Sequence, residues 1–203
     1  FVLVFNGGKI INYETGEIVY NKTIPVELVP AVYEQACRLG VGVLTYKGNT
    51  IIHGNGVNEY SRNEGKINGM PIKEVDNFAE YVDYPVNKFL MTGEPEKIAK
   101  AQDVMRQTFG EQLNIFRSEP FFLEIVPPSI DKAYSLGKLL EYLGEKKEQM
   151  ICCGDGFNDK SMIAFAGLGV AMANAQPEVK EVADYITTSN DEDGVALVID
   201  RFM

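Results

Sequence analysis

Short apolar segments alternate with helical patterns along the last third of the chain, and this alternation constrains the fold more than any other feature. Apolar runs predict strands at residues 149–153, 169–172 and 185–187. Strand–helix–strand units of this kind build parallel sheets, because a right-handed crossover returns the chain to the same sheet. The sequence therefore predicts an α/β domain, with helices expected at residues 161–166, 177–183 and 195–202 and a leucine stripe that ends at Gly144.

Two acids and two glycines follow the first of these strands directly, at residues 154–159. Ligands of open parallel sheets bind at such strand ends. Glycine lets the backbone approach a ligand closely, and carboxylates such as Asp155 and Asp159 are the oxygen ligands that Mg²⁺ prefers. An Asx-rich turn with a helix cap fits the spacing equally well, so both interpretations stay open. The loop reads Gly154-Asp155-Gly156-Phe157-Asn158-Asp159.

The first 126 residues show a different pattern, in which hairpins and amphipathic helices predict an α+β insert with an antiparallel sheet. Residues 1–5 are an apolar run that predicts a buried strand, and residues 9–22 predict a hairpin around Glu14-Thr15-Gly16. Pro127-Pro128 predicts a domain boundary, because proline cannot extend a strand ladder. The other expected elements are helices from Val29 to Gly40 and from Pro95 to Gly110, strands at 41–46, 50–53, 88–91, 113–117 and 120–126 with a turn at Ser118-Glu119, and loops and short helices over 54–84.

Composition excludes several classes of protein. The formal net charge of −10 and the absence of a Lys/Arg cluster argue against nucleic acid as a partner. No apolar run reaches the roughly 18 residues of a membrane-spanning helix, so no membrane partner is expected. Three cysteines, two of them adjacent in a predicted strand, do not make a disulfide framework, which predicts a reducing, cytoplasmic location.

The candidate chemistry narrows further because His53 is the only histidine. A Ser-His-acid or Cys-His system would have to use it, but its position in a predicted strand favours a partly exposed residue or a local ligand contact. Zinc ligand spacing and a phosphate-binding Gly-Lys-Ser/Thr loop are both missing. Lys132, just after the predicted boundary and at a helix start, is the strongest cationic partner for the acids, although a solvated lysine is the simpler alternative.

These residues resemble the haloacid dehalogenase superfamily, and within it the Cof-type sugar phosphatases with the larger α+β cap. The resemblance implies a Rossmann-like core, of which the C-terminal half is present and the first strands are absent, and an inserted cap domain. It divides the chain into residues 1–8 at the end of the first core segment, a cap at 9–126 and core at 127–203. The matching segments are residues 154–159, Gly167 to Ala175, Ala183-Asp184-Tyr185, Asp193 to Ala196, Phe122 to Ile125 leading to Lys132, and Asn6-Gly7-Gly8.

The resemblance also implies roles for five residues. Asp155 would bind a Mg²⁺ cofactor, and Asp159 would support the metal or Lys132 from close by. Lys132 would hold the phosphoryl group, Asn158 would hydrogen-bond the substrate phosphate, and Asn6 would lie at the edge of the site. The implied substrate is a small phosphorylated metabolite, which the sequence does not name, and the oligomeric state is left open.

Two departures qualify the resemblance. The family's nucleophile lies in an Asp-x-Asp motif on a first strand, and neither an Asp-x-Asp on such a strand nor the Ser/Thr that follows it in the family is found here. We therefore expect a fragment whose nucleophile lies outside the 203 residues and which releases no phosphate alone. Ala133 also replaces the glycine that usually follows the lysine. A phosphomutase of the same superfamily and a non-catalytic phosphometabolite-binding module remain as alternatives.

Overall fold

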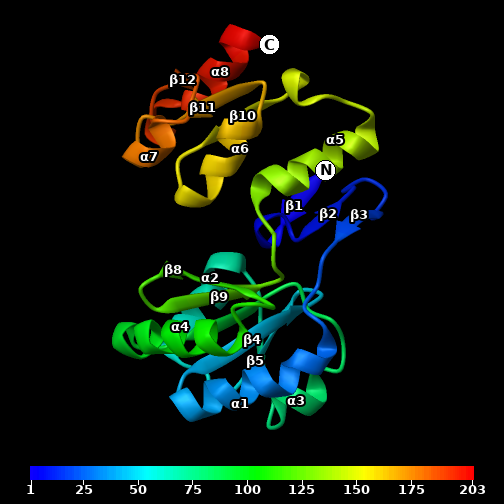
Figure 1. Cartoon of the computed structure of the whole chain (residues 1–203), viewed down its shortest axis with the longest axis vertical. Coiled ribbons are helices and arrows are strands. Elements are labelled where there is room, and N and C mark those ends of the chain that lie inside the picture. The colour runs from blue at the N-terminus through cyan, green and yellow to red at the C-terminus, as the bar shows by residue number, and fades with distance from the viewer. The chain divides into compact units, whose positions relative to one another are not determined.

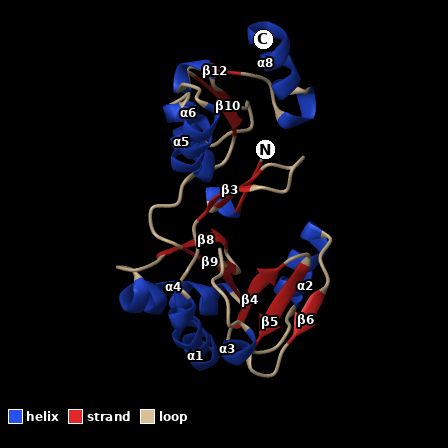
Figure 2. Ribbon diagram, turned by 90° about the vertical axis from the view of Figure 1, so that its right-hand side faces the viewer, coloured by secondary structure: helices blue, strands red, loops and turns tan.

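The computed structural model describes residues 1–203, and the chain divides into two compact units (Figures 1 and 2). Unit 1 combines Phe1–Asn21 with Ile130–Met203, and unit 2 is Lys22–Ser129. The second boundary lies close to Pro127-Pro128. The first boundary lies after Asn21 rather than after residue 8, because the hairpin of residues 9–21 pairs with the N-terminal strand.

A six-stranded sheet forms the centre of unit 2, with the order β6-β5-β4-β7-β9-β8. All neighbours are antiparallel except β5 and β6, so the predicted antiparallel sheet of the insert is confirmed with one parallel pair at its edge. The strands are β4 (Gly42–Lys47), β5 (Thr50–Gly54), β6 (Ile72–Glu74), β7 (Phe89–Thr92), β8 (Asn114–Glu119) and β9 (Phe122–Val126).

Helices cover both faces of this sheet. Buried side chains of α1, α3 and α4 pack with one face, and Tyr60 of α2 belongs to the cluster on the other. The side chain of Asn58 caps α2 by accepting a hydrogen bond from the backbone N–H of Ser61 at 2.9 Å. The sequence predicted short helices within residues 54–84 but did not place this one. The helices are α1 (Val29–Leu39), α2 (Glu59–Asn68), α3 (Phe78–Tyr81) and α4 (Pro95–Phe109), with a 3-10 turn η2 (Val26–Leu28).

The helix ends in unit 2 follow their predicted signals. Gly40 ends α1 in the left-handed conformation that glycine adopts without steric cost. Pro95 opens α4, and the predicted stripe of α4 is buried. One turn differs from its prediction: β8 continues through Ser118-Glu119, so the chain reverses at Pro120 and Phe121 instead.

Unit 1 holds two separate three-stranded sheets. The strands β1 (Val2–Val4), β2 (Lys9–Ile11) and β3 (Ile18–Asn21) are antiparallel. The strands β10 (Ile151–Gly154), β11 (Leu168–Ala171) and β12 (Tyr185–Ile186) are parallel, which confirms the predicted parallel sheet. The helices are α5 (Lys132–Leu143), α6 (Lys160–Phe165), α7 (Pro177–Lys180) and α8 (Gly194–Phe202), with 3-10 turns η1 (Phe5–Gly7), η3 (Lys147–Gln149), η4 (Phe157–Asp159) and η5 (Asn190–Glu192).

The predicted buried strand at residues 1–5 is wrong in two respects. Only Val2–Val4 are extended, because Phe5 already begins the turn η1, and β1 pairs with β2 at the edge of its sheet. Phe1 and Val2 are exposed, at 48% and 39% of their accessible surface. An apolar run predicts burial only where another layer covers it, and this strand has at most one covered face.

Candidate phosphoryl-binding site in unit 1

The loop after β10 is held by a carboxylate that lies inside it. Asp159 is 6% exposed, and its Oδ2 accepts hydrogen bonds from the backbone N–H groups of Asp155 and Gly156, each at 3.0 Å. Gly154 makes this closure possible, since a Cβ there would lie 2.5 Å from the Cβ of Asp159. The glycine-bracketed sequence therefore folds into a turn closed by its own second acid.

Lys132 meets this loop from α5, where it is the first helical residue. Its Nζ forms an ion pair with Oδ1 of Asp159, so the structure brings together two residues that are far apart in the sequence. Burial alone would raise the pKa of Asp159, but the hydrogen bond from Lys132 and the amides of Gly156 and Asp155 hold that pKa below its usual value. Asp159 therefore stays ionised at neutral pH and holds the ammonium group in place.

Asp155 points outward from the same loop. Asp155 is exposed, and its Oδ2 accepts a hydrogen bond from Nδ2 of Asn174 at 2.8 Å. Asn174 is itself oriented by the backbone N–H of Asn190, which donates to its Oδ1 at 3.0 Å. The sequence pattern predicted no role for Asn174. Its position just after β11, beside the end of β10 in a parallel sheet, is the signal that could have suggested a role at the site.

The two asparagines predicted at the site also approach each other. Nδ2 of Asn158 lies 3.3 Å from Oδ1 of Asn6. Asn6 sits in η1 with a φ of 54°, and its neighbours Phe5 and Gly7 also have positive φ, at 56° and 93°. Phe5 and Asn6 carry side chains in this sparsely populated region, so the turn is strained and persists only when surrounding contacts hold it.

The donor set fits a hard divalent cation in part. Asp155 supplies one exposed carboxylate, whereas both oxygens of Asp159 are already occupied by Lys132 and two backbone amides. No group of three or more His, Cys, Asp or Glu side chains gathers to hold a metal ion. Mg²⁺ suits such a site, because it keeps several waters and takes one or two carboxylates together with substrate phosphate.

A cavity of about 460 Å³ adjoins Lys132. Apolar side chains from β1, α5 and α6 line most of it, and Asn6 and Gly7 contribute its edge. The ammonium group of Lys132 thus has the buried carboxylate of Asp159 as its partner and an apolar cavity as a neighbour. A low-polarity neighbourhood strengthens the attraction between a lysine and an anion. The lining residues are Leu3, Asn6, Gly7, Lys132, Leu136 and Met162.

Neither alternative nucleophile is suited to act at this site. His53 lies in unit 2 and is fully buried, so the prediction of a partly exposed residue is wrong. Burial lowers the pKa of His53 to about 4, which makes it neutral at physiological pH. Cys152 is buried in β10, and burial raises the pKa of its thiol to about 11, so it is a poor nucleophile.

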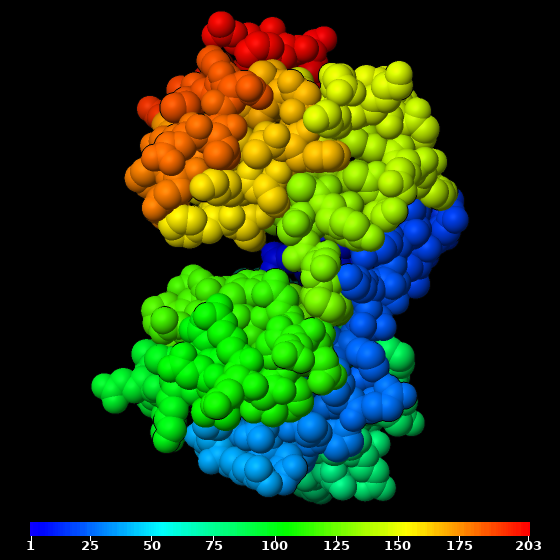
Figure 3. Space-filling model, in the orientation of Figure 1, coloured from blue at the N-terminus to red at the C-terminus, as the bar shows by residue number.

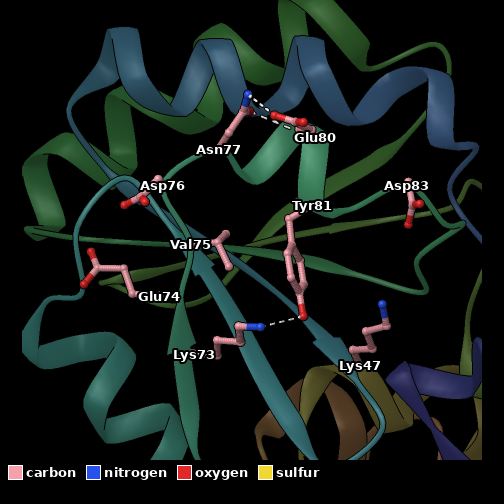
Figure 4. Close-up of a pocket in the computed structure, with 9 residues that line it drawn as sticks. All are labelled: Lys47, Lys73, Glu74, Val75, Asp76, Asn77, Glu80, Tyr81 and Asp83. Carbon is pink, nitrogen blue, oxygen red and sulfur yellow. Dashed lines mark hydrogen bonds between the residues drawn. The ribbon is translucent and has the colours of Figure 1, made fainter.

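A second cavity, of about 700 Å³, lies in unit 2 (Figure 4). Lys73 donates to the hydroxyl of Tyr81 at 3.0 Å, and Nζ of Lys47 lies 5.3 Å from the centre of the Tyr81 ring. Four carboxylates share the lining with these two lysines, so the cavity carries a net negative charge that opposes a phosphate. An anion is therefore better accommodated beside Lys132 in unit 1. The acids of this cavity are Glu74, Asp76, Glu80 and Asp83.

No helix in the structure combines the length and the apolar character needed to cross a bilayer.

Comparison with known proteins gives this arrangement a family. A solved structure of a haloacid dehalogenase-like hydrolase from Bacteroides thetaiotaomicron matches with a TM-score of 0.94 and 46% identity, over 98% of this chain and 75% of that one. A solved sugar phosphatase of subclass IIB in the same superfamily matches with a TM-score of 0.78 and 26% identity, over 97% of this chain and 73% of that one. A 5-amino-6-(5-phospho-D-ribitylamino)uracil phosphatase, YcsE of Bacillus subtilis, is 51% identical over 90 residues, which are 44% of this chain and 36% of that protein.

The sequence pattern of the haloacid dehalogenase-like hydrolases matches residues 1–199. The chain belongs to this family, and the resemblance inferred from the loop at 154–159 and from Lys132 is confirmed at the level of the family.

Proposed function

We propose that unit 1 carries the phosphoryl-binding part of a Mg²⁺-dependent phosphatase that acts on small phosphorylated metabolites, with sugar phosphates as the substrate class. The observation that carries the proposal is the pair of Lys132 and Asp159 beside the exposed Asp155. The likeness to the subclass IIB sugar phosphatase supports the substrate class. Family membership supports hydrolysis over simple binding.

Each side chain has a distinct task in this proposal. Lys132 binds a phosphoryl oxygen with the N–H groups that Asp159 leaves over, and Asp159 fixes the direction of the ammonium group. Asn158 donates an amide hydrogen bond to the phosphate, and Asn6 orients that amide through its Oδ1. Asp155 would hold Mg²⁺, which, when bound, neutralises charge on the phosphoryl oxygens.

The overall reaction breaks the P–O bond to the leaving group and forms a P–O bond to an oxygen of water. The attacking group is not one of the side chains named here. We propose that it is an aspartate outside the 203 residues, in keeping with the family resemblance: its carboxylate oxygen forms the first new P–O bond as the leaving group departs, and water then cleaves this aspartyl-phosphate to release phosphate. We further propose that unit 2 acts as a cap that selects the leaving group. The chain alone is then expected to bind phosphate without releasing it from an ester.

Titration calorimetry with inorganic phosphate and Mg²⁺ tests the binding part of the proposal. Lys132→Met is expected to weaken phosphate binding at least tenfold, because it removes the cation that faces the phosphoryl group. Lys138→Met is a matched control, since Lys138 lies on the same helix and pairs with Glu141 instead of Asp159. Equal phosphate affinity of Lys132→Met and wild type would exclude the assigned role of Lys132.

A second measurement addresses the cation. Asp155→Asn removes the exposed carboxylate while the amide keeps its size, and we expect Mg²⁺ to stop enhancing phosphate affinity in this variant. Glu141→Gln, on the exposed side of α5, serves as the control for a lost surface charge. If Mg²⁺ enhances phosphate binding equally in wild type and Asp155→Asn, Asp155 is not the metal ligand.

A further inference from the structure

Ser135 is a buried polar residue whose hydroxyl joins two distant segments of unit 1. It lies on α5 one turn after Lys132 and is 0% exposed. Its Oγ donates to the backbone carbonyl of Gly7 at 2.5 Å and lies 3.1 Å from the carbonyl oxygen of Asp131. The contact with Asp131, four residues earlier, is the usual local bond of a serine in a helix. The contact with Gly7 joins the helix to a distant segment.

The close approach of Ser135 requires a residue without a side chain at position 7. A Cβ at Gly7 would lie 2.1 Å from Oγ of Ser135 and 2.7 Å from its Cβ, so no other residue fits there without displacing the helix. Gly7 also has a φ of 93°, which side chains rarely adopt. The serine and the glycine therefore form one close junction between η1 and α5.

This junction holds a turn that would otherwise relax. Phe5 and Asn6 both have positive φ, a conformation that is costly for residues with a side chain and that persists only under external constraint. The bond from Ser135 acts on the residue directly after Asn6. It therefore fixes the direction in which the Asn6 side chain points toward Asn158.

We propose that Ser135 is a positioning residue for the phosphoryl site, acting through Gly7 on Asn6 and thereby on the amide of Asn158. The inference rests on the proposed function for its effect on phosphate. The same helix delivers Lys132 at its first turn and Ser135 at its second, so a single rigid element sets both the cation and the asparagine pair.

A double-mutant cycle with inorganic phosphate and Mg²⁺ tests the path of this effect. Ser135→Ala and Asn6→Ala are each expected to weaken phosphate binding about three- to tenfold. Because Ser135 acts through Asn6, the double variant should bind no more weakly than Asn6→Ala alone. An equal loss from Ser135→Ala in the wild-type and Asn6→Ala backgrounds, or no loss in either, would overturn the proposal.

Two further variants separate positioning from stability. Ser61→Ala removes another fully buried serine hydroxyl, in unit 2, and is expected to lower the unfolding temperature without changing phosphate affinity. Ser135→Cys replaces the hydroxyl by a larger thiol that is a weaker donor, so it should also weaken phosphate binding and remains informative if Ser135→Ala does not fold. Phosphate affinity that follows the unfolding temperature across all these variants would contradict a positioning role.

A ligand-free measurement distinguishes failure of this inference from failure of the proposed function. The side-chain amide resonances of Asn158 in a ¹H–¹⁵N spectrum report its contact with Asn6. They should shift alike in Ser135→Ala and Asn6→Ala, and stay unchanged in Ser61→Ala. Unchanged Asn158 resonances in Ser135→Ala would reject the positioning role, whereas shifted resonances in a protein that binds no phosphate would reject only the proposed function.

Discussion

The contacts that stabilise unit 1 internally differ in kind from those that stabilise unit 2. Unit 2 buries a large apolar cluster that includes Phe78, Phe89 and Leu123, all fully inaccessible. The cluster in unit 1 is much smaller, with Ile163 and Val179 as its larger members. Polar contacts contribute more to unit 1, above all the ion pair of Lys132 and Asp159 and the hydrogen bond from Ser135 to Gly7. The candidate site therefore lies in the unit that has the smaller apolar core.

The surface of α8 extends this contrast. This helix, red in Figure 3, buries Val198 but leaves Val195, Leu197 and Ile199 about half exposed. Buried apolar area is the main favourable term in folding, at roughly 25 cal/mol per Å². A unit that exposes so much apolar surface gains less stability from its residues than unit 2 gains from its own.

The largest predicted effect compares the same substitution in both units. Leu123→Ala should destabilise unit 2 by about 3 kcal/mol, because the fully buried side chain leaves a cavity in a packed core. Leu136→Ala should destabilise unit 1 by only about 1 kcal/mol, since Leu136 is half-buried beside an existing cavity. Amide hydrogen exchange, read separately for the two units, measures both values. Equal losses would mean that the two cores are packed alike.

Acid should destabilise unit 2 at a higher pH than unit 1. The pKa of His53 is about 4 in the folded state and 6.5 in the unfolded state, so the unfolded state binds the proton first. Unit 2 is therefore expected to lose up to about 3 kcal/mol as the pH falls from 6.5 to 4. Asp159 has a lowered pKa, so its contribution to unit 1 is present above 3.8 and is lost only as the pH falls below that value.

The measurement is unfolding by urea at a series of pH values, followed with a probe in each unit. His53→Leu removes the titrating group, and the stability of unit 2 should then lose most of its dependence on pH between 6.5 and 4. An unchanged pH dependence in His53→Leu would assign the effect to other groups. Asp159→Asn should leave the stability of unit 2 unchanged over this pH range.

The smallest predicted effect should be the same in both units. Gly40 and Gly144 end α1 and α5 with φ values of 62° and 71°, and nothing lies within 4 Å of a Cβ at either position. Replacing either by alanine is expected to cost about 1 kcal/mol, because the penalty arises in the local backbone. Thermal unfolding of Gly40→Ala and Gly144→Ala measures it. A clear difference between the two would show that even the helix ends depend on the core around them.

Much of the fold could be predicted because local signals and tertiary structure agree. The stripe of α4 with Pro95 and Gly110 at its ends, and the glycine after α1, are short-range patterns that packing did not override. The helix α2 falls where short helices were expected but could not be placed, because its residues are mostly polar and its start depends on the capping pair of Asn58 and Ser61. The strand β1 was assigned to a buried core because an apolar run does not say what covers it.

The candidate site divides in the same way. Asp155 and Asp159 were found from the loop sequence, and Lys132 was singled out at a helix start, but their proximity came from the family resemblance, because 26 residues separate Lys132 from Asp159. Asn174 and Ser135 were missed. Each acts through one hydrogen bond to a group that only the folded chain brings near, and no local pattern reports such a contact.

The closed turn around Asp159 has one more consequence, for the direction from which an anion can arrive. A lysine ammonium group carries three N–H bonds, and Lys132 commits one of them to Oδ1 of Asp159. Because Oδ2 is held by two backbone amides, this carboxylate cannot swing aside when a second anion comes near. The two remaining N–H bonds therefore point away from Asp159, and an anion that binds Lys132 must approach from that side. In this way the fixed carboxylate of Asp159 restricts the orientation of the otherwise flexible Lys132 ammonium group.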